Sequence, residues 1–336
     1  MNTVSSGTPS LSEVPDLGLF CRAMPRIART DLDVFPLCLG GNVFGWTIDE
    51  QQSFDVLVRY LAAGGNFIDT ADVYSAWVPG HAGGESETII GRWMAARGVR
   101  SRMVIATKVG MSPGLKGLSS GTIRTAAEAS LRRLGVASID LYYAHADDPA
   151  IPLDESLRAF DALVKEGKVR YIGASNYTAP RLAEALGISG RDGLARFIAV
   201  QPHYNLMHRH DYEGELSALC GRESVSCVPY YGLAKGFLTG KYRPGKNVDS
   251  VRATGAQAYL DARGLRVLEV LDDIVAARHT TVAAVSLAWL RVQPGVVAPI
   301  ASARTIGQLA ELLPVADLEL TRQEIARLST ASSGHE

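Results

Sequence analysis

The fold is decided by three consecutive segments, MVIATKVG (103–110), SSGTIRTAAEASLRRLG (119–135) and IDLYYAH (139–145). The first and third are short apolar runs, which is the pattern of strands buried in a parallel sheet. The second has apolar residues three and four positions apart and ends at a glycine, as an amphipathic helix does. A strand, a helix and a second strand in this order predict two parallel strands joined by a crossover helix.

The same alternation extends in both directions along the chain. Further strands are expected at 35–41, 66–70, 169–176, 197–204, 224–231 and 295–301, and further helices at 49–65, 85–98, 153–168, 178–187, 212–223, 265–279, 281–292 and 305–316. Eight strand-helix units close a (β/α)8 barrel, so we expect a single-domain TIM barrel over 26–330 after a flexible N-terminal tail over 1–25. A doubly wound sheet is the competitor, but LGGNVFGWT (39–47) lacks its G-x-G-x-x-G pattern.

Three connections are longer than a simple strand-helix turn. They cover 75–84, 111–121 and 232–259, and each follows the expected C-terminal end of a strand. The active sites of (β/α)8 barrels lie at that face, where long loops usually cover the substrate and the cofactor.

The composition excludes several classes of protein. The 336 residues include 34 Lys and Arg against 35 Asp and Glu, a net charge of −1, which disfavours a nucleic-acid or membrane-surface binder. No apolar run reaches the length of a membrane span. The four cysteines, Cys21, Cys38, Cys220 and Cys227, form no metal-binding or redox spacing and are expected to be reduced and buried in a soluble cytoplasmic protein. The oligomeric state is not readable from these features.

Four polar residues lie at the ends of neighbouring predicted strands: Asp69, Tyr74, Lys108 and His145. Because the C-terminal ends of parallel strands share one rim, these side chains should converge. A lysine ammonium lowers the pKa of a nearby phenol, and a carboxylate holds that ammonium in place. A histidine beside the phenol can orient a carbonyl by donating a hydrogen bond. The set could polarise and protonate a carbonyl, but it supplies no hydride, which implies a nicotinamide cofactor.

The sequence resembles the aldo-keto reductase superfamily, including its bacterial reductases and the related potassium-channel β subunits. The resemblance rests on the following segments: NFIDTADVY, GGESETIIGRW, VIATKVG, IDLYYAH, KEGKVRYIGASNY, VQPHYNL, PYYGLAKGFLTGKY and ARTIGQLAELL. They occur in the family's order from about residue 26 to residue 316. The resemblance implies that Asp69, Tyr74, Lys108 and His145 are the catalytic tetrad, with Tyr74 as the proton donor in the NADPH-dependent reduction of an aldehyde or ketone.

The resemblance also implies where the cofactor lies. The residues that it assigns to the cofactor are Ser175, Asn176, Gln201, Tyr230, Leu233, Gly236, Lys241, Arg252, Arg304 and Gln308. Ser175, Asn176 and Gln201 match the residues that hold the nicotinamide carboxamide, and Tyr230 matches the aromatic residue that stacks on the ring. Arg304 and Lys241 favour NADP, with NAD not excluded. Tyr231 and Gly232 depart from the family pattern, in which Ser and Pro follow the stacking aromatic residue.

The remaining candidates lie in loops. Trp46, Trp77 and His81 are placed at the expected mouth and could form the wall of the substrate pocket, although packing of the loops on each other explains them equally well. The HRH segment (208–210) and His203 resemble a metal cluster. No metal is expected there, because the segment is an ordinary strand-helix loop and no carboxylate or cysteine is expected to converge with it.

Two other functions stay open on the sequence alone. The protein could be a cofactor-sensing binding subunit with only slow chemistry, as the β-subunit resemblance allows. It could also be a lyase or isomerase built on the same barrel. A small-molecule carbonyl substrate, with no nucleic acid or membrane partner, remains the expectation, and the substrate itself is not identified.

Overall fold

The computed structural model describes residues 24–334. Cys21 and the predicted tail over 1–25, apart from its last two positions, lie outside the described residues. The core is an eight-stranded parallel sheet in the order β10-β1-β2-β3-β6-β7-β8-β9. Its strands are β1 (Cys38–Gly40), β2 (Phe67–Asp69), β3 (Val104–Val109), β6 (Ile139–Ala144), β7 (Val169–Ser175), β8 (Phe197–Gln201), β9 (Ser226–Cys227) and β10 (Ile300–Ala301). Each of the eight predicted strand segments contains one of them.

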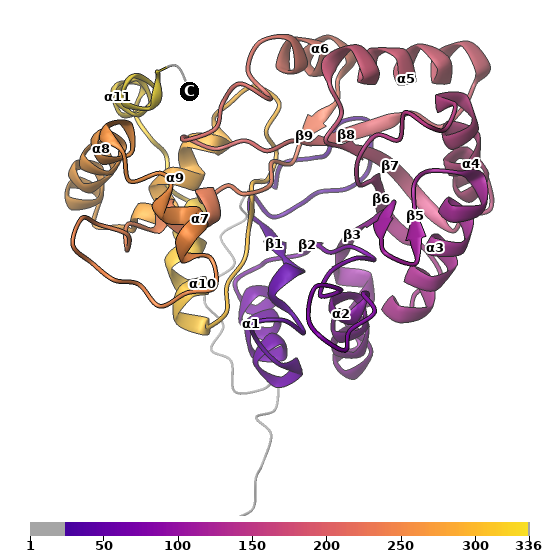
Figure 1. Cartoon of the computed structure of the whole chain (residues 1–336), viewed down its shortest axis with the longest axis horizontal. Coiled ribbons are helices and arrows are strands. Elements are labelled where there is room, and N and C mark those ends of the chain that lie inside the picture. Colours follow the sequence, from indigo (N-terminus) through magenta and orange to yellow (C-terminus); the bar gives the residue numbers. More distant parts are fainter. Residues whose placement is uncertain (1–23, 335–336) are drawn as a thin grey trace, which may run out of the picture.

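The sheet curls until its two edges meet. Backbone hydrogen bonds join the segments that carry the edge strands β9 and β10: Cys227 N–H donates to Gly295 O at 2.7 Å, Val297 N–H to Cys227 O at 3.0 Å, and Ile300 N–H to Pro229 O at 2.9 Å. The strong curl of the strands is visible in Figure 1. The predicted α/β class with eight parallel strands is therefore confirmed.

Side chains of the sheet alternate between two hydrophobic clusters. Phe67 and Ala106 belong to a smaller cluster of strand residues, whereas their neighbours Ile68 and Ile105 pack in the larger cluster with the helices. This alternation follows from the two-residue period of a strand. One set of side chains therefore fills the space that the curled sheet surrounds, and the other set binds the helices to its outer face.

Gly173 in β7 allows one of the large inner side chains to pack. A Cβ atom at this position would lie 2.4 Å from the ring of Tyr143, far inside van der Waals contact. Tyr143 itself is fully buried in the smaller cluster. The absence of a side chain at Gly173 thus leaves the volume that the Tyr143 ring occupies.

Helices surround the sheet, with α1 and α2 below it in Figure 1, α3 to α6 on the right and top, and α8 to α11 on the left. The helices are α1 (Glu50–Ala62), α2 (Glu85–Arg97), α3 (Ser120–Leu134), α4 (Leu153–Lys165), α5 (Ala179–Asp192), α6 (Glu215–Glu223), α7 (Ala253–Gln257), α8 (Ala262–Arg278), α9 (Val282–Arg291), α10 (Ile306–Leu312) and α11 (Arg322–Ser332). Short 3-10 helices are η2 (Gly41–Val43), η3 (Arg100–Arg102), η4 (Ala234–Thr239) and η5 (Leu313–Ala316). Over residues 24–334, no helix has the length and apolar character that a membrane span requires.

Several elements were not expected from the sequence. Helix α11 packs against α8 beyond the last predicted helix, and a capping box between Thr321 and Glu324 begins it. A two-stranded hairpin of β4 (Met111–Ser112) and β5 (Leu115–Lys116) and the short helices α7 and η4 lie within two of the long connections. The capping pattern TRQE (321–324) was a readable helix-start signal, whereas the short loop elements carry no comparable periodicity.

Candidate active site

The four residues predicted to act together converge at the C-terminal edge of the sheet. Asp69 ends β2, Lys108 lies near the end of β3, and His145 directly follows β6. Tyr74 lies in the loop after β2. Because β2, β3 and β6 are consecutive in the sheet, their parallel direction brings these chain positions to one rim.

Lys108 is the centre of the cluster. Its Nζ lies 2.7 Å from Asp69 Oδ2, 2.8 Å from Tyr74 OH and 2.8 Å from the backbone oxygen of Thr70. The side chain is fully buried, and Asp69 is only 2% exposed. The three contacts use all three hydrogens of the ammonium, so the buried charge is paired and its position is fixed.

Gln201 adds a contact that the sequence did not predict. This residue, expected at the cofactor, donates from Nε2 to Asp69 Oδ1 at 2.9 Å. Asp69 therefore uses Oδ2 for Lys108 and for the Tyr74 hydroxyl, which donates to it at 3.2 Å, and Oδ1 for Gln201 at the end of β8. To predict this contact, one must know how strands that are distant in sequence meet across the curled sheet. No sequence motif indicates it.

Tyr74 is a neutral phenol in this arrangement. Burial, together with the nearby Asp69 carboxylate, raises the pKa of Tyr74 well above its ordinary value. The net lowering that we expected from Lys108 is therefore wrong for this structure, because the same site that brings the ammonium also removes water and adds a carboxylate. A protonated Tyr74 can donate a proton, and the Lys108 ammonium at 2.8 Å can stabilise the phenolate left behind.

His145 is also uncharged. Burial, with the Lys108 charge as a second cause, lowers the pKa of His145 well below its ordinary value. Its ring lies 6.2 Å from the Tyr74 ring, centroid to centroid, at 73°. The Nδ1 atom is buried and has no hydrogen-bond partner among the described residues. A neutral imidazole carries one N–H, which can donate a hydrogen bond to a carbonyl oxygen beside Tyr74.

A cavity of about 530 Å³ opens beside this cluster. Asp69, Tyr74 and His145 line it, whereas Lys108 lies behind Tyr74 and Asp69. All the residues that the sequence assigned to the cofactor also line it, namely Ser175, Asn176, Gln201, Tyr230, Leu233, Gly236, Lys241, Arg252, Arg304 and Gln308. The structure therefore brings together, around one cavity, groups that lie far apart in the sequence.

A chain of hydrogen bonds orders the cavity wall at the ends of β7 and β8. Asn176 Nδ2 donates to the backbone oxygen of His145 at 2.9 Å, and Tyr230 OH donates to Asn176 Oδ1 at 2.8 Å. Ser175 Oγ donates to the backbone oxygen of Gln201 at 2.9 Å. These bonds hold the amide of Asn176 and the ring of Tyr230 in fixed orientations beside His145.

Four cationic side chains line the cavity, and besides Lys235 they are Lys241, Arg252 and Arg304. Lys241 and Arg252 come from the long connection after β9, and Arg304 lies just before α10. None of the three forms an ion pair with another residue of the described chain; Lys241 lies over the Tyr242 ring and Arg252 over the Trp46 ring. Uncompensated cations around a cavity of this size suit an anionic ligand such as a dinucleotide phosphate.

The three residues that were predicted to form the pocket wall differ from one another in their position relative to the cavity. Trp77 lines the cavity and is 47% exposed. Trp46 lies behind it, with ring centroids 5.4 Å apart at 86°. His81 does not line the cavity, and its Nδ1 lies 4.0 Å from Glu85 Oε1 at the start of α2. The loop after β2 turns His81 outward, a direction that its sequence position alone did not reveal.

Sequence reasoning missed a buried charged group behind the site. Glu87 in α2 is fully buried, and it accepts hydrogen bonds at 2.6 Å from Thr107 Oγ1 and from Arg133 Nε. Asp72 lies nearby, is 4% exposed, and has no hydrogen-bond partner for either carboxylate oxygen among the described residues. Burial, reinforced by the Glu87 charge, raises the pKa of Asp72 to about 7. The acidic residues within the segments GGESE and TADVY were the sequence feature that could have indicated this buried group.

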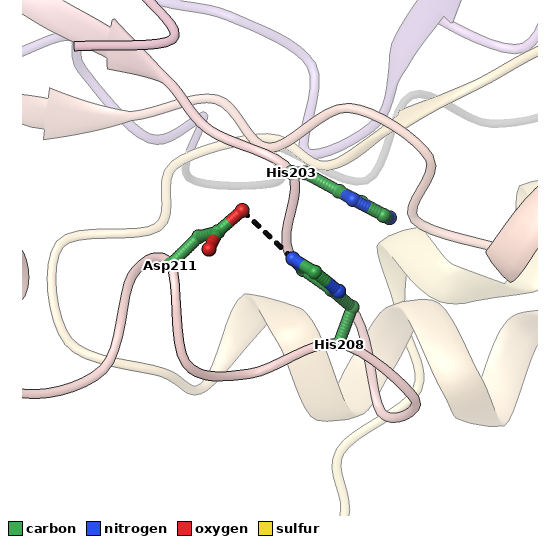
Figure 2. Close-up of side chains that lie close together, drawn as sticks. All are labelled: His203, His208 and Asp211. Carbon is green, nitrogen blue, oxygen red and sulfur yellow. Dashed lines mark hydrogen bonds and ion pairs between the residues drawn. The ribbon is translucent and has the colours of Figure 1, made fainter. Parts of the chain in front are cut away.

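The histidine loop after β8 also differs from expectation. His203 and His208 stack, with ring centroids 3.8 Å apart and 10° between the planes. Asp211 converges with them, and its Oδ2 lies 2.7 Å from His208 Nε2, as Figure 2 shows. Our expectation that no carboxylate meets these histidines was therefore wrong, because the turn after His208 folds Asp211 back onto the ring.

Comparison with known proteins places the chain among oxidoreductases. The model of the Aldo/keto reductase family matches residues 36–332. The chain is 32% identical over 317 residues to uncharacterized oxidoreductase YrpG of Bacillus subtilis, covering 92% of this chain and 95% of that protein. It is 31% identical to norsolorinic acid reductase stcV of Emericella nidulans, covering 94% and 82%. It is also 31% identical to a probable voltage-gated potassium channel subunit beta of Oryza sativa, covering 87% and 90%.

Proposed function

Because this chain belongs to the Aldo/keto reductase family, we propose that it is an NADP(H)-dependent reductase that converts an aldehyde or ketone to an alcohol. The observation that carries the proposal is Tyr74, which lines the cavity and whose hydroxyl lies 2.8 Å from the Lys108 ammonium. The reductase names of several relatives agree with it, among them the norsolorinic acid reductases.

The proposed reaction uses Tyr74 as the acid. Nicotinamide, when bound, supplies the hydride that adds to the carbonyl carbon. His145 donates a hydrogen bond to the carbonyl oxygen and orients it toward the Tyr74 hydroxyl. Tyr74 gives its proton to the oxygen of the new alcohol, and Lys108 stabilises the resulting phenolate. Asp69 keeps Lys108 in place through the 2.7 Å ion pair.

We assign the cofactor to the cavity wall that runs from Ser175 to Gln308. Ser175, Asn176 and Gln201 would hold the carboxamide, and Tyr230 would stack on the nicotinamide ring. Leu233 and Gly236, at and near the start of η4, would cover the pyrophosphate together with Lys241 and Arg252. Leu233 and Gly236 both line the cavity. The positive φ of 101° at Gly236 suits a close approach of the backbone to a phosphate.

The preference for NADP over NAD is assigned to Arg304 and Lys241. Both line the cavity, and neither forms an ion pair with another described residue. Gln308 Oε1 accepts a hydrogen bond from the Arg304 backbone at 2.9 Å, which fixes the turn before α10. A guanidinium at this position can bind a 2′-phosphate bidentately, a contact that NAD cannot make.

The curled parallel sheet supports a closed single-domain (β/α)8 barrel over 26–330, with its long loops at the C-terminal face. The cavity at the strand ends agrees with the general placement of active sites in that fold. We also place the protein in the cytoplasm, since Cys38, Cys220 and Cys227 are buried free thiols that suit a reducing compartment. The binding-subunit alternative is not favoured, because the complete acid-base cluster suits turnover.

A carbonyl panel tests the proposed function. The full chain is mixed with NADPH and a series of aldehydes and ketones, with NADH in parallel, and the loss of cofactor absorbance is followed. We expect turnover on several carbonyls, faster with NADPH than with NADH. Binding of NADPH without turnover on any member of the panel would favour the cofactor-sensing subunit. Failure to bind either cofactor would reject the reductase and leave the lyase or isomerase alternative.

A further inference from the structure

Three side chains with metal-binding atoms meet in the loop between β8 and α6. One ligand atom from each of His203, His208 and Asp211 lies within 4.8 Å of the other two. Figure 2 shows the two imidazole rings lying face to face, with the Asp211 carboxylate directed at His208. We propose that this cluster binds one divalent transition-metal ion of the zinc type through two imidazole nitrogens and one carboxylate oxygen.

The kinds of donor atom define the class of ion. Two imidazoles with one carboxylate form a borderline donor set that zinc and its transition-metal neighbours prefer. Magnesium and calcium prefer sites built from oxygen atoms alone. The cluster should therefore discriminate zinc from magnesium, and this discrimination is a property that a merely negative surface would lack.

The side chain of Asn205 borders His203. The amide of Asn205 is oriented by two bonds: Oδ1 accepts from Met207 N–H at 2.8 Å, and Nδ2 donates to the Tyr231 backbone oxygen at 2.9 Å. Asn205 Nδ2 also lies 3.4 Å from His203 Nε2, a long contact in which this ring nitrogen can act as the acceptor.

Asp211 is the shared partner of two histidines of this loop, His208 and His210. Its Oδ2 lies 2.7 Å from His208 Nε2, and its Oδ1 lies 2.7 Å from His210 Nε2. A metal ion would take the place of a proton between the carboxylate and His208. The His210 side chain is 59% exposed and lies at the edge of the cluster, where it can supply a further ligand.

Binding requires a limited rearrangement. A metal lies close to the plane of each imidazole that ligates it, whereas the two rings now stack at 3.8 Å. His208 must therefore turn out of the stack while His203 keeps its place beside Tyr230, with ring centroids 5.4 Å apart. The Asp211 side chain is 45% exposed and can follow that movement. The site adjoins the cavity through Tyr230 and shares no residue with the proposed acid-base cluster.

Calorimetric titration of the tag-free full chain with zinc chloride tests the proposal, and magnesium chloride is titrated in parallel. We expect one zinc per chain and no comparable uptake of magnesium. His203→Gln and His208→Gln should each weaken zinc binding by at least about tenfold. Asp211→Asn, which changes an exposed side chain, should weaken it as well and covers the case in which a His203 variant fails to fold.

His279→Asn is the matched control, because His279 is an exposed histidine at the C-terminal end of α8 and outside the cluster. Its zinc affinity should equal that of the wild type. The proposal is overturned if wild-type protein takes up no zinc, if magnesium binds equally well, or if the three cluster variants keep wild-type affinity. It is also overturned if His279→Asn loses as much affinity as they do. Every arm measures binding, so the outcome does not depend on the reductase activity.

Discussion

Lys108 is the residue whose contacts explain the site most completely. Its ammonium is fully buried and satisfied by Asp69, Tyr74 and the Thr70 carbonyl. A lysine within an otherwise apolar strand segment is costly unless it is paired, so its position in VIATKVG indicated a partner before any contact was known. The contact with Tyr74 gives that charge a second use, which is to stabilise the phenolate after proton transfer.

Replacement of Lys108 by Met is expected to affect both stability and turnover. The Asp69 carboxylate would remain buried without its cation, which costs about 3–5 kcal/mol of unfolding free energy. Turnover should fall by roughly 100-fold or more, since an acid-base group loses its stabilising partner. Urea unfolding and steady-state kinetics on one aldehyde measure the two effects. A variant that keeps wild-type turnover would show that the ammonium does not assist Tyr74.

Asp72 predicts a dependence of stability on pH. Its pKa is raised from 3.8 to about 7 in the folded protein, mainly by burial. Between these values the folded state holds a proton that the unfolded state has lost, so the contribution of Asp72 to stability falls as pH rises. The contribution is largest below the unfolded pKa and is lost above the folded one.

Asp72→Asn should remove this dependence. From about pH 5 to about pH 8, the wild type should lose about 2–3 kcal/mol of unfolding free energy relative to the variant. Urea unfolding of both proteins at the two pH values provides the measurement. If the unfolding free energy changes equally in wild type and variant between the two pH values, Asp72 is ionised throughout this range.

At the scale of elements, the eight strands and their main helices were predictable, because buried parallel strands and amphipathic helices leave distinct patterns. The hairpin of β4 and β5 and the short helices α7 and η4 were not, since a few residues in a loop have no period to detect. Helix α11 was missed although the sequence at 321–324 contains a capping box. Its first turn could have been found by that signal, but its packing on α8 could not.

Gly173 in β7 tests how tightly the inner layer packs. Gly173→Ala places a Cβ atom where the Tyr143 ring now lies, 2.4 Å away. The overlap should lower the unfolding free energy by about 1–3 kcal/mol. Gly187→Ala is the control, because Gly187 lies within α5 with no atom near its Cβ position, and alanine there should add about 0.5–1 kcal/mol. Equal effects of the two changes would contradict the packing described for β7.

At the scale of the molecule, the cavity combines groups from almost the whole length of the chain. Strand-end position predicted that Asp69, Lys108 and His145 would meet, since parallel strands share one rim. It did not predict that Gln201 bonds to Asp69, that His81 turns outward or that Asp211 meets His203 and His208. Those contacts depend on the paths of loops and on distances across the sheet, which spacing along the chain does not contain.

Replacement of Arg304 tests the proposed binding site for the 2′-phosphate. Arg304→Ala should weaken NADPH binding by roughly 10- to 100-fold, as expected for the loss of a charged hydrogen bond to a phosphate. NADH binding should change little, because NADH lacks the 2′-phosphate. Titration of cofactor fluorescence with the wild type and the variant measures both affinities. An equal loss for the two cofactors would place Arg304 elsewhere on the dinucleotide.

The central claim is that Tyr74 donates the proton, and Tyr74→Phe tests it most directly. The change removes one oxygen atom and leaves the ring in the cavity wall, so NADPH should bind with nearly wild-type affinity by fluorescence titration. Single-turnover reduction of an aldehyde by the bound NADPH should slow by roughly 100- to 10,000-fold. Retained NADPH binding with this loss of rate is the predicted result. Reduction at the wild-type rate by Tyr74→Phe would show that another group supplies the proton.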